Sequence, residues 1–283
     1  MLGASVTFTG MTTLVKFLGS DYSPTLQTFY RLTAALVILL PFMLRGGRRT
    51  FYTNRPLMLI SRAALGVAGV SLAFYAFQVM PLAQANALSF TRSLWVTLLA
   101  AVVMREHVGP MRTGAVVVGF LGVVVMLAQG LSAGQLALGL PAGAMLLSAF
   151  LLAFSVAGIK LLAPDHSPLS VMIWGVVLGW VFSIPGALLA WRWPAPSDFG
   201  LLCLMGVLST INQAMFIRGM QAGDAAAMAP IDYTRLVFAA IVGFAIFDEV
   251  PDVWTVIGAA IIVGSTLFIT IREIQLARRA RQG

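Results

Sequence analysis

The sequence alternates between long apolar runs and short polar joints. Ten of the runs are long enough to cross a lipid bilayer, which takes about 20 mostly apolar residues. They cover residues 1–19, 24–44, 57–80, 82–104, 110–130, 139–162, 168–191, 198–218, 222–247 and 252–272. Within each run the apolar residues are continuous rather than alternating, which indicates helices and not the strands of a membrane barrel. The pattern therefore predicts an all-α polytopic membrane protein with ten transmembrane helices.

The joints between the runs carry most of the polar, glycine and proline residues. Examples are residues 20–24 (SDYSP), 163–168 (APDHSP) and 248–252 (DEVPD). None of the joints is long enough to hold a folded domain, so recognition and chemistry should lie within the membrane region. No basic residue precedes the first run, and we expect the natural N-terminus to lie a few residues earlier.

Composition narrows the class of protein further. Hydrophobic residues make up 59% of the chain and charged residues 10%, whereas a soluble domain carries about 25% charged residues. The single cysteine, Cys203, lies in an apolar run, which argues against a disulfide framework and a cysteine-based metal site. We therefore expect a chain embedded in the lipid bilayer, with no metal and no cofactor.

The basic residues indicate how the chain sits in the membrane. Cytoplasmic joints are enriched in Lys and Arg, and most basic residues fall on one side if both termini are cytoplasmic. That side would hold Arg45, Arg48, Arg49, Arg55, Arg105, Arg112, Lys160, Arg218, Arg272, Arg278, Arg279 and Arg281. We therefore expect a bacterial-type inner membrane, with the net charge of +8 contacting anionic lipid and no nucleic acid.

The first half of the chain recurs in the second half. Residues 15–24 (VKFLGSDYSP) and 159–168 (IKLLAPDHSP) share Lys, Leu, Asp, Ser and Pro at positions 144 apart. Farther on, Thr91, Arg92 and Glu106 recur 143 positions later as Thr234, Arg235 and Glu249. Shared Leu and Val would arise by chance in so apolar a chain, but charged residues matching in register would not. The sequence therefore predicts two copies of one unit.

Each copy holds five of the predicted helices, over residues 1–133 and 134–283. Because five is odd, the second copy enters the membrane from the side opposite to the first. An inverted-topology repeat of this kind is typical of secondary transporters, whose substrate site lies near the membrane midplane between the halves. Some channels share the symmetry, so the repeat favours a transporter without excluding a channel.

Five segments together resemble the drug/metabolite transporter superfamily, in particular its ten-span proteins built of two EamA-type domains. They are residues 16–24 (KFLGSDYSP, with Lys-x-Leu ending the first run and Ser-Pro starting the second), 29–31 (FYR), 105–123 (REHVGPMRTGAVVVGFLGV), 225–236 (AAAMAPIDYTRL) and 248–265 (DEVPDVWTVIGAAIIVGS). The resemblance covers nearly the whole chain. It implies alternating access around a cavity lined mainly by spans 1, 3, 4, 6, 8 and 9. It also implies a small-molecule substrate, since members move amino acids, other metabolites and toxic compounds, usually outward.

Four ionisable residues lie well inside predicted helices, where a charge is costly and marks a functional site by default. They are Arg31, Arg92, Asp232 and Arg235. Arg92 and Arg235 are repeat counterparts near the middle of their helices, where a guanidinium facing a cavity would hold a carboxylate. The alternative is that both bond backbone carbonyls or reach a water-filled vestibule. For Arg31, about two turns after Pro24, we favour a structural role, and for Arg62 an anchoring role at the cytoplasmic face.

Asp232 is the only acidic residue well inside a predicted helix. A carboxyl group in a low-dielectric site can take up and release a proton near neutral pH, so Asp232 is the candidate for proton coupling. It lies three residues before Arg235, on the same helical face. We favour a lasting ion pair between the two, which would keep Asp232 ionised, and proton coupling stays open.

Polar and aromatic side chains on the same helices complete the candidate substrate site. Besides Arg92 and Arg235, they are Tyr75, Gln78, Asn86, Ser89, Phe90, Trp95, Asn212, Gln213, Phe216 and Tyr233. Ser89, Arg92 and Trp95 are spaced by three residues and share one helical face. An apolar pocket with a few converging polar groups suits an amphipathic organic solute, although each aromatic residue can equally serve in packing.

The surplus of arginine inside the membrane favours an exporter of amino acids, aromatic ones included, or of related carboxylated metabolites. Efflux of lipophilic cations is the alternative, and it would need an acid free of Arg235 within an aromatic cage. An intramembrane enzyme would need a nucleophile–base pair or a metal cluster within the helices, but His107 and His166 both lie in joints. The energy source, and the choice between monomer and homodimer, stay open.

Overall fold

The computed structural model describes residues 2–50, 53–102, 109–132, 136–162, 168–222 and 233–282. Within these ranges every regular element is a helix. The elements are α1 (Leu2–Phe17), the short 3-10 helix η1 (Leu18–Ser20), α2 (Pro24–Thr50), α3 (Pro56–Val79), α4 (Leu82–Ser89), α5 (Thr91–Val102), α6 (Pro110–Ser132), α7 (Leu136–Leu162), α8 (Pro168–Leu189), α9 (Pro196–Ala222), α11 (Thr234–Phe247) and α12 (Val253–Gln282). The all-helical class is therefore confirmed for this part of the chain.

Seven of the described helices are long and apolar enough to cross a membrane: α2, α3, α6, α7, α8, α9 and α12. Each begins within a few residues of the start of an apolar run, because the length of apolar sequence is what the bilayer selects. The helix α1 has 16 residues and α11 has 14, and the residues directly before α11 lie outside the described ranges. The structure thus supports seven spanning helices, and the count of ten stays a prediction.

The fourth apolar run was predicted as one helix, and this prediction is wrong: it forms two helices, α4 and α5, which meet at Phe90. Hydroxyl groups explain the break. Ser89 Oγ donates to Asn86 O at 2.7 Å, and Thr91 Oγ1 donates to Leu88 O at 2.6 Å. Such side-chain bonds compete with the backbone bonds of a helix. At the junction the N–H of Phe90 donates to Ala87 O at 3.1 Å, a bond over three residues instead of the four of an α-helix.

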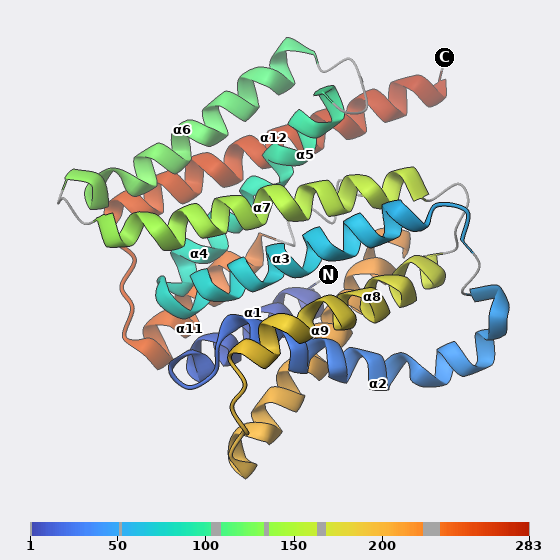
Figure 1. Ribbon diagram of the computed structural model, residues 1–283. Coiled ribbons are helices and arrows are strands. Elements are labelled where there is room, and N and C mark those ends of the chain that lie inside the picture. Colours follow the sequence, from blue (N-terminus) through green and yellow to red (C-terminus); the bar gives the residue numbers. More distant parts are fainter. Residues whose placement is uncertain are drawn as a thin grey trace.

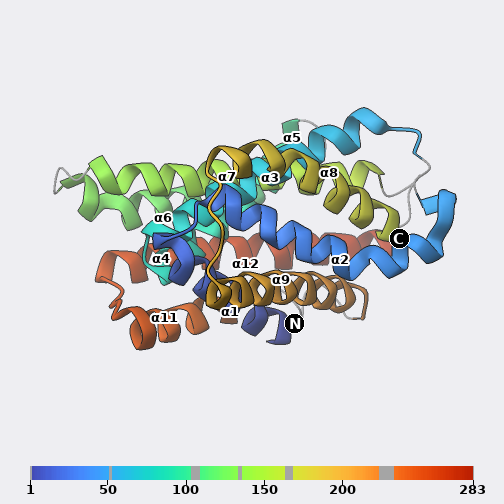
Figure 2. The same ribbon diagram turned by 60° about the horizontal axis from the view of Figure 1, so that its bottom comes forward.

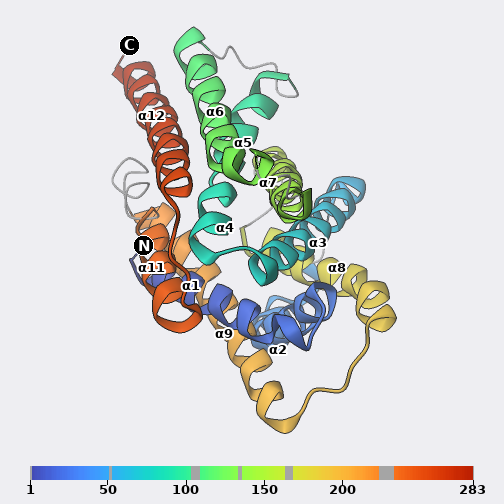
Figure 3. The same cartoon turned by 90° about the vertical axis from the view of Figure 1, so that its left-hand side faces the viewer.

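The helices pack side by side, mostly in antiparallel pairs (Figure 1). The main pairs are α3 with α7, α1 with α9, α2 with α8, and α6 with α12. The pair α6–α12 forms one edge of the molecule, and α2, α8 and α9 form the opposite edge. The second view shows α9 running alongside α2, with which it is in contact (Figure 2). Seen from the side, α3, α4 and α7 lie between the two edges (Figure 3).

One end of the bundle is closed by packed side chains, and we call it the sealed end. Helices α1 and α3 end there and α2 and α4 begin there, at the left of Figure 1. Leu18, Met80 and Leu82 are at most 3% exposed, and Tyr22 in the turn before α2 is 2% exposed. We call the opposite end, where α3 and α8 begin, the far end.

The α6–α12 pair depends on two glycines that bring the helix backbones together. A Cβ atom on Gly258 would lie 2.6 Å from Gly122 O. We expect Gly258→Ala to force the helices apart and to lower the free energy of unfolding by about 1–3 kcal/mol, as overpacking usually does. The measurement is the thermal unfolding midpoint in detergent. Gly264→Ala is the control, because a Cβ atom there meets nothing within 4 Å; equal losses in both variants would contradict the prediction.

Candidate functional site

A cavity of about 440 Å³ lies between the two edges of the bundle. One face of α3 lines its whole length, through Arg62, Gly66, Val70, Phe74 and Phe77, which are spaced by three or four residues. The other walls come from α1, α2, α7, α8, α9 and α11 and from the junction of α4 with α5. The volume falls in the range of pockets that hold small organic molecules.

Four arginines line this cavity, and none of the described residues in its wall is acidic. Arg31 comes from α2, Arg62 from α3, Arg92 from α5 and Arg235 from α11. Their neighbours in the wall carry hydroxyl, amide, thioether and hydrocarbon groups. Arginine side chains in a low-dielectric wall attract an anionic group and repel a cation.

Arg92 and Arg235 belong to the part of the cavity where α4, α5 and α11 meet. Arg235 is 6% exposed, and its Nη2 donates to Ser89 Oγ at 3.2 Å. Its guanidinium lies over the rings of Phe8, at 4.8 Å, and Phe90, at 4.1 Å. The hydroxyl and the two ring faces stabilise a charge that hydrocarbon alone would expel. We call Ser89, Arg92 and Arg235 the central arginine site.

Arg31 lies at the contact of α2 with α9. Its Nη1 donates to Ser209 Oγ at 3.1 Å, and its guanidinium lies 5.9 Å from the ring centre of Phe74. From the sequence we assigned a structural role to Arg31 and an anchoring role to Arg62, so neither was placed in the substrate site; the structure puts both in the cavity wall. No spacing within α3 signals this place for Arg62, because the space beside its side chain depends on residues of α7 and α8.

An ion pair holds the sealed end together. Lys16, at the end of α1, pairs with Glu249 in the loop before α12, and the two side chains are 12% and 17% exposed. Lys16 Nζ also donates to Met80 O at 2.7 Å, and the N–H of Leu82 donates to Glu249 Oε2 at 2.8 Å. The pair therefore ties α1 and the α11–α12 loop to the turn between α3 and α4, just beyond Phe77 at the end of the cavity wall.

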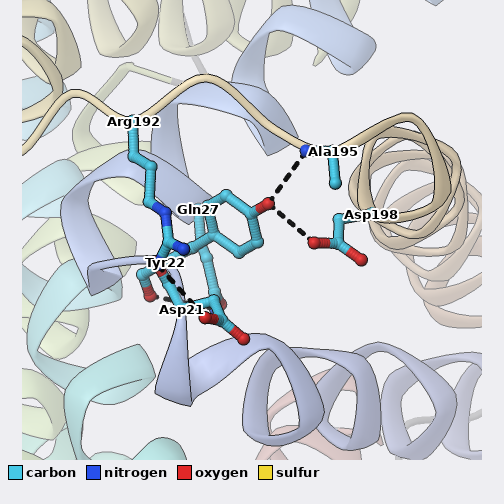
Figure 4. Close-up of polar contacts among 6 residues, drawn as sticks. All are labelled: Asp21, Tyr22, Gln27, Arg192, Ala195 and Asp198. Carbon is cyan, nitrogen blue, oxygen red and sulfur yellow. Dashed lines mark hydrogen bonds and ion pairs between the residues drawn. The ribbon is translucent and has the colours of Figure 1, made fainter.

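A second cluster closes the sealed end from the side of α8 and α9 (Figure 4). Tyr22 Oη donates to Asp198 Oδ2 at 2.7 Å and accepts the N–H of Ala195 at 3.3 Å, and Arg192 Nη1 contacts Asp21 Oδ1 at 3.1 Å. Burial raises the pKa of the Tyr22 hydroxyl above its ordinary value of 10.0, and the Asp198 carboxylate raises it further. Folding favours the protonated hydroxyl of Tyr22. Its contribution to the free energy of unfolding is therefore complete below pH 10 and is lost only as the pH rises through the raised pKa.

Five of the residues predicted for the substrate site lie in the cavity wall: Ser89, Arg92, Asn212, Gln213 and Arg235. Asn212 also bonds the backbone, since its Nδ2 donates to Ala4 O at 2.6 Å. Six others lie outside the described wall: Tyr75, Gln78, Asn86, Phe90, Trp95 and Tyr233.

Three of these six make contacts inside the bundle. Gln78 Nε2 donates to Tyr22 O at 3.2 Å, at the sealed end. Asn86 Nδ2 donates to a carbonyl of its own helix at 2.9 Å. Trp95 packs edge-on against Phe120, with ring centres 4.8 Å apart. The amide N–H groups of Gln78 and Asn86 thus serve local structure in this conformation. Trp95 Nε1 is buried and has no hydrogen-bond partner in the described part of the chain.

Phe90 and Tyr233 lie behind the central arginine site, with ring centres 4.8 Å apart. They are 143 positions apart, the same spacing as between Arg92 and Arg235. Tyr75 is 36% exposed. The side chain of Phe216 and the whole of Asp232 lie outside the described residues. Among the residues that are described, no group of three or more His, Cys, Asp and Glu side chains could hold a metal ion.

Both halves of the chain match one family of proteins: residues 1–128 and 140–271 fit the EamA-like transporter family. Among similar proteins, an S-adenosylmethionine uptake transporter of Rickettsia bellii is 30% identical over 91% of this chain and 87% of its own length. A riboflavin transporter of Vibrio cholerae is 29% identical over 99% and 95%. A pseudopaline exporter of Pseudomonas aeruginosa is 26% identical over 92% and 90%.

A solved crystal structure shares the fold. It matches with a TM-score of 0.65 and covers 99% of this chain and 97% of its own, at 20% sequence identity. This likeness concerns the helix arrangement alone.

The ion pair at the sealed end predicts strong coupling between its residues. Glu249→Gln leaves the largely buried Lys16 without its carboxylate, which usually lowers the free energy of unfolding by about 3–5 kcal/mol. We expect large losses of thermal stability for Glu249→Gln and for Lys16→Met, and for the double variant a loss well below their sum. Additive losses would contradict the coupling. Arg192→Gln is the control, because its ion pair is exposed and such pairs contribute at most about 1 kcal/mol.

Proposed function

The chain belongs to the EamA-like transporter family, and we propose that it is a secondary transporter that moves small carboxylated organic solutes across the membrane by alternating access. Amino acids, aromatic ones included, and related metabolites are the solutes we expect first. The observation that carries this proposal is the cavity wall, which contains four arginines and, in the described part of the chain, no acidic residue. A carboxylated solute would pair with this positive charge.

The central arginine site is the proposed seat of the carboxylate. A guanidinium can bind a carboxylate through two parallel N–H bonds. Arg235 is already oriented by Ser89 Oγ and by the ring faces of Phe8 and Phe90, so less freedom is lost on binding. The apolar wall of α3, with residues such as Val70, would receive the hydrocarbon part of the solute.

Two features support an inverted repeat of two five-helix units, residues 1–133 and 134–283. The family fits the chain twice, once in each half. The helix contacts also come in matched sets. When each helix is exchanged for its counterpart in the other half, the contact α3–α7 becomes α9–α1 and α3–α8 becomes α9–α2, and all four contacts occur. Units packed in this way could exchange conformations, which is the physical basis of alternating access.

We propose further that ten spans cross a bacterial inner membrane with both termini in the cytoplasm. Arg45 and Arg55, at the far end of α2 and α3, would then face the cytoplasm, in agreement with the excess of basic residues expected there. The sealed end would face the periplasm. The conformation would be one that is closed toward that side.

The names of the relatives widen the choice of solute and of direction. They include S-adenosylmethionine uptake, riboflavin transport and pseudopaline export, so uptake and export both occur among similar chains. S-adenosylmethionine carries a carboxylate beside a sulfonium cation, whereas riboflavin carries a ring system without a carboxylate. The two solutes therefore separate recognition of the carboxylate from recognition of the ring, and both belong in the test.

Efflux of lipophilic cations is the alternative function. It requires ring faces open to the solute's cation and an acid to balance it. The ring faces of Phe8 and Phe90 already hold Arg235, and the arginines repel a second cation. The cavity therefore favours a carboxylated solute.

Uptake into proteoliposomes tests the proposal, with labelled phenylalanine, leucine, succinate, S-adenosylmethionine, riboflavin and a quaternary ammonium compound. We expect saturable transport of a carboxylated solute. Its KM should rise about 10- to 100-fold in Arg92→Ala and in Arg235→Ala, as for the loss of a charge-assisted hydrogen bond. Arg55→Ala is the control, because Arg55 is exposed and does not line the cavity. Transport of the quaternary cation alone, unchanged by either central substitution, would overturn the proposal.

Proton coupling through Asp232 is a separate proposal, on a residue outside the described ranges. In the repeat Asp232 is the counterpart of Ser89, the partner of Arg235, so we expect its carboxyl group to serve Arg92. If it carries the proton, a pH gradient should stimulate transport by the natural protein. Asp232→Asn should abolish that stimulation and leave exchange of labelled for unlabelled solute at equal pH. Gradient-driven transport by Asp232→Asn would contradict this role.

A further inference from the structure

Arg62 lies in the wall of the cavity near the far end, outside the central arginine site. Its Nη1 donates to Val171 O at 3.4 Å, and its backbone O accepts Ser155 Oγ at 3.3 Å. Its Nε is buried and has no hydrogen-bond partner in the described part of the chain. Because a guanidinium has five N–H donors, Arg62 keeps donors that a ligand could use.

Two glycines on neighbouring helices lie against the side chain of Arg62, and the closer one is Gly175. A Cβ atom on Gly175 of α8 would lie 3.1 Å from Arg62 Nη1, and one on Gly158 of α7 would lie 3.5 Å from Arg62 Cδ. The side chain therefore passes between α7 and α8 with its guanidinium at the cavity wall. An arginine that served only to anchor α3 in lipid headgroups would not need this space.

Arg62 is well separated from the other arginines along the cavity. It lies twelve residues before Phe74 on α3, a rise of about 18 Å. Arg31 lies over the ring of Phe74, so it is at the level of Phe74 along α3. Arg235 lies over the ring of Phe8, which packs against Phe77, so Arg235 is near the level of Phe77. An amino acid or a short dicarboxylate is too small to contact Arg62 and Arg235 together.

Arg31 also packs against a glycine. A Cβ atom on Gly206 of α9 would lie 3.5 Å from Arg31 Cα, and one on Gly175 of α8 would lie 3.1 Å from Arg62 Nη1. Arg31 lies seven residues from the start of α2 and Arg62 six from the start of α3, about 10 Å from the sealed and far ends respectively.

We propose that Arg62 forms an outer anion-binding subsite, at which the carboxylate of a solute binds between the far end of the cavity and the central arginine site. The inference deepens the proposed function and rests on it, because it assigns the same cavity a second, separate position for the same carboxylate. Val171 O and the two glycines hold the guanidinium in place, and the remaining N–H groups bind the anion. The class of ligand is a small organic anion.

Charge-selective labelling of a cysteine beside Arg62 tests the subsite without any transported solute. Ser155 lines the cavity and bonds the backbone of Arg62, so Ser155→Cys is introduced into a Cys203→Ala background, which removes the only natural cysteine. Its reaction rate is measured in proteoliposomes with a sulfonate-bearing and with a trimethylammonium-bearing methanethiosulfonate. The ratio of the two rates is compared in Arg62→Gln, Arg62→Lys and the control Arg55→Gln, after size-exclusion chromatography has shown each variant to be folded.

We expect Arg62→Gln to lower the ratio of anionic to cationic labelling at least fivefold, Arg62→Lys to restore most of it, and Arg55→Gln to leave it unchanged. Benzoate should slow the labelling of the introduced cysteine in the protein with Arg62 and not in Arg62→Gln. Three results would overturn the subsite. The ratio could change equally in Arg55→Gln, it could stay the same in Arg62→Gln, or neither reagent could react with the introduced cysteine. If the ratio responds to Arg62 but no carboxylated solute is transported, the subsite stands and the proposed solute class falls.

Discussion

The contact between Lys16 and Glu249 is the interaction on which the rest of the structure depends. A cavity lined by arginines inside a membrane protein can exist only if the helices around it are held at one end while the middle stays unfilled. Glu249 meets this need by accepting both the ammonium of Lys16 and the N–H of Leu82. Three segments far apart in the sequence are thereby joined at one point, and the packed residues around them exclude water from that end of the cavity.

The second constraint is the charge of the cavity itself. A guanidinium in hydrocarbon needs partners, and the partners found for Arg31 and Arg235 are hydroxyl groups and ring faces: Ser209 and Phe74 for the first, Ser89, Phe8 and Phe90 for the second. These groups are themselves uncharged, so they orient each guanidinium without adding negative charge to the wall. In the proposed function, an anionic solute binds to the arginines.

The apolar runs of the sequence predicted most of the fold, because the bilayer fixes the length of apolar sequence that a helix needs. Helices such as α3 and α8 begin where Pro56 and Pro168 follow a polar joint. The break between α4 and α5 was missed, since it arises from local hydroxyl bonds of Ser89 and Thr91 that an apolar count does not register.

Part of the candidate site could also be predicted from the sequence. Arg92 and Arg235 stood out because the sequence alone shows that they lie deep in predicted helices and that they match at the spacing of the repeat. The place of Arg62 was not visible, because it depends on its close contact with Gly175, about a hundred residues away in the chain. Space beside a side chain is a tertiary property, and no spacing within α3 reveals it.

The hydroxyl partners of Arg31 and Arg235 also bear on transport. A serine hydroxyl orients a guanidinium through one bond and itself adds no negative charge to the site. Ser209 and Ser89 position Arg31 and Arg235 in this way, which suits a site that must bind an anion and release it in each cycle.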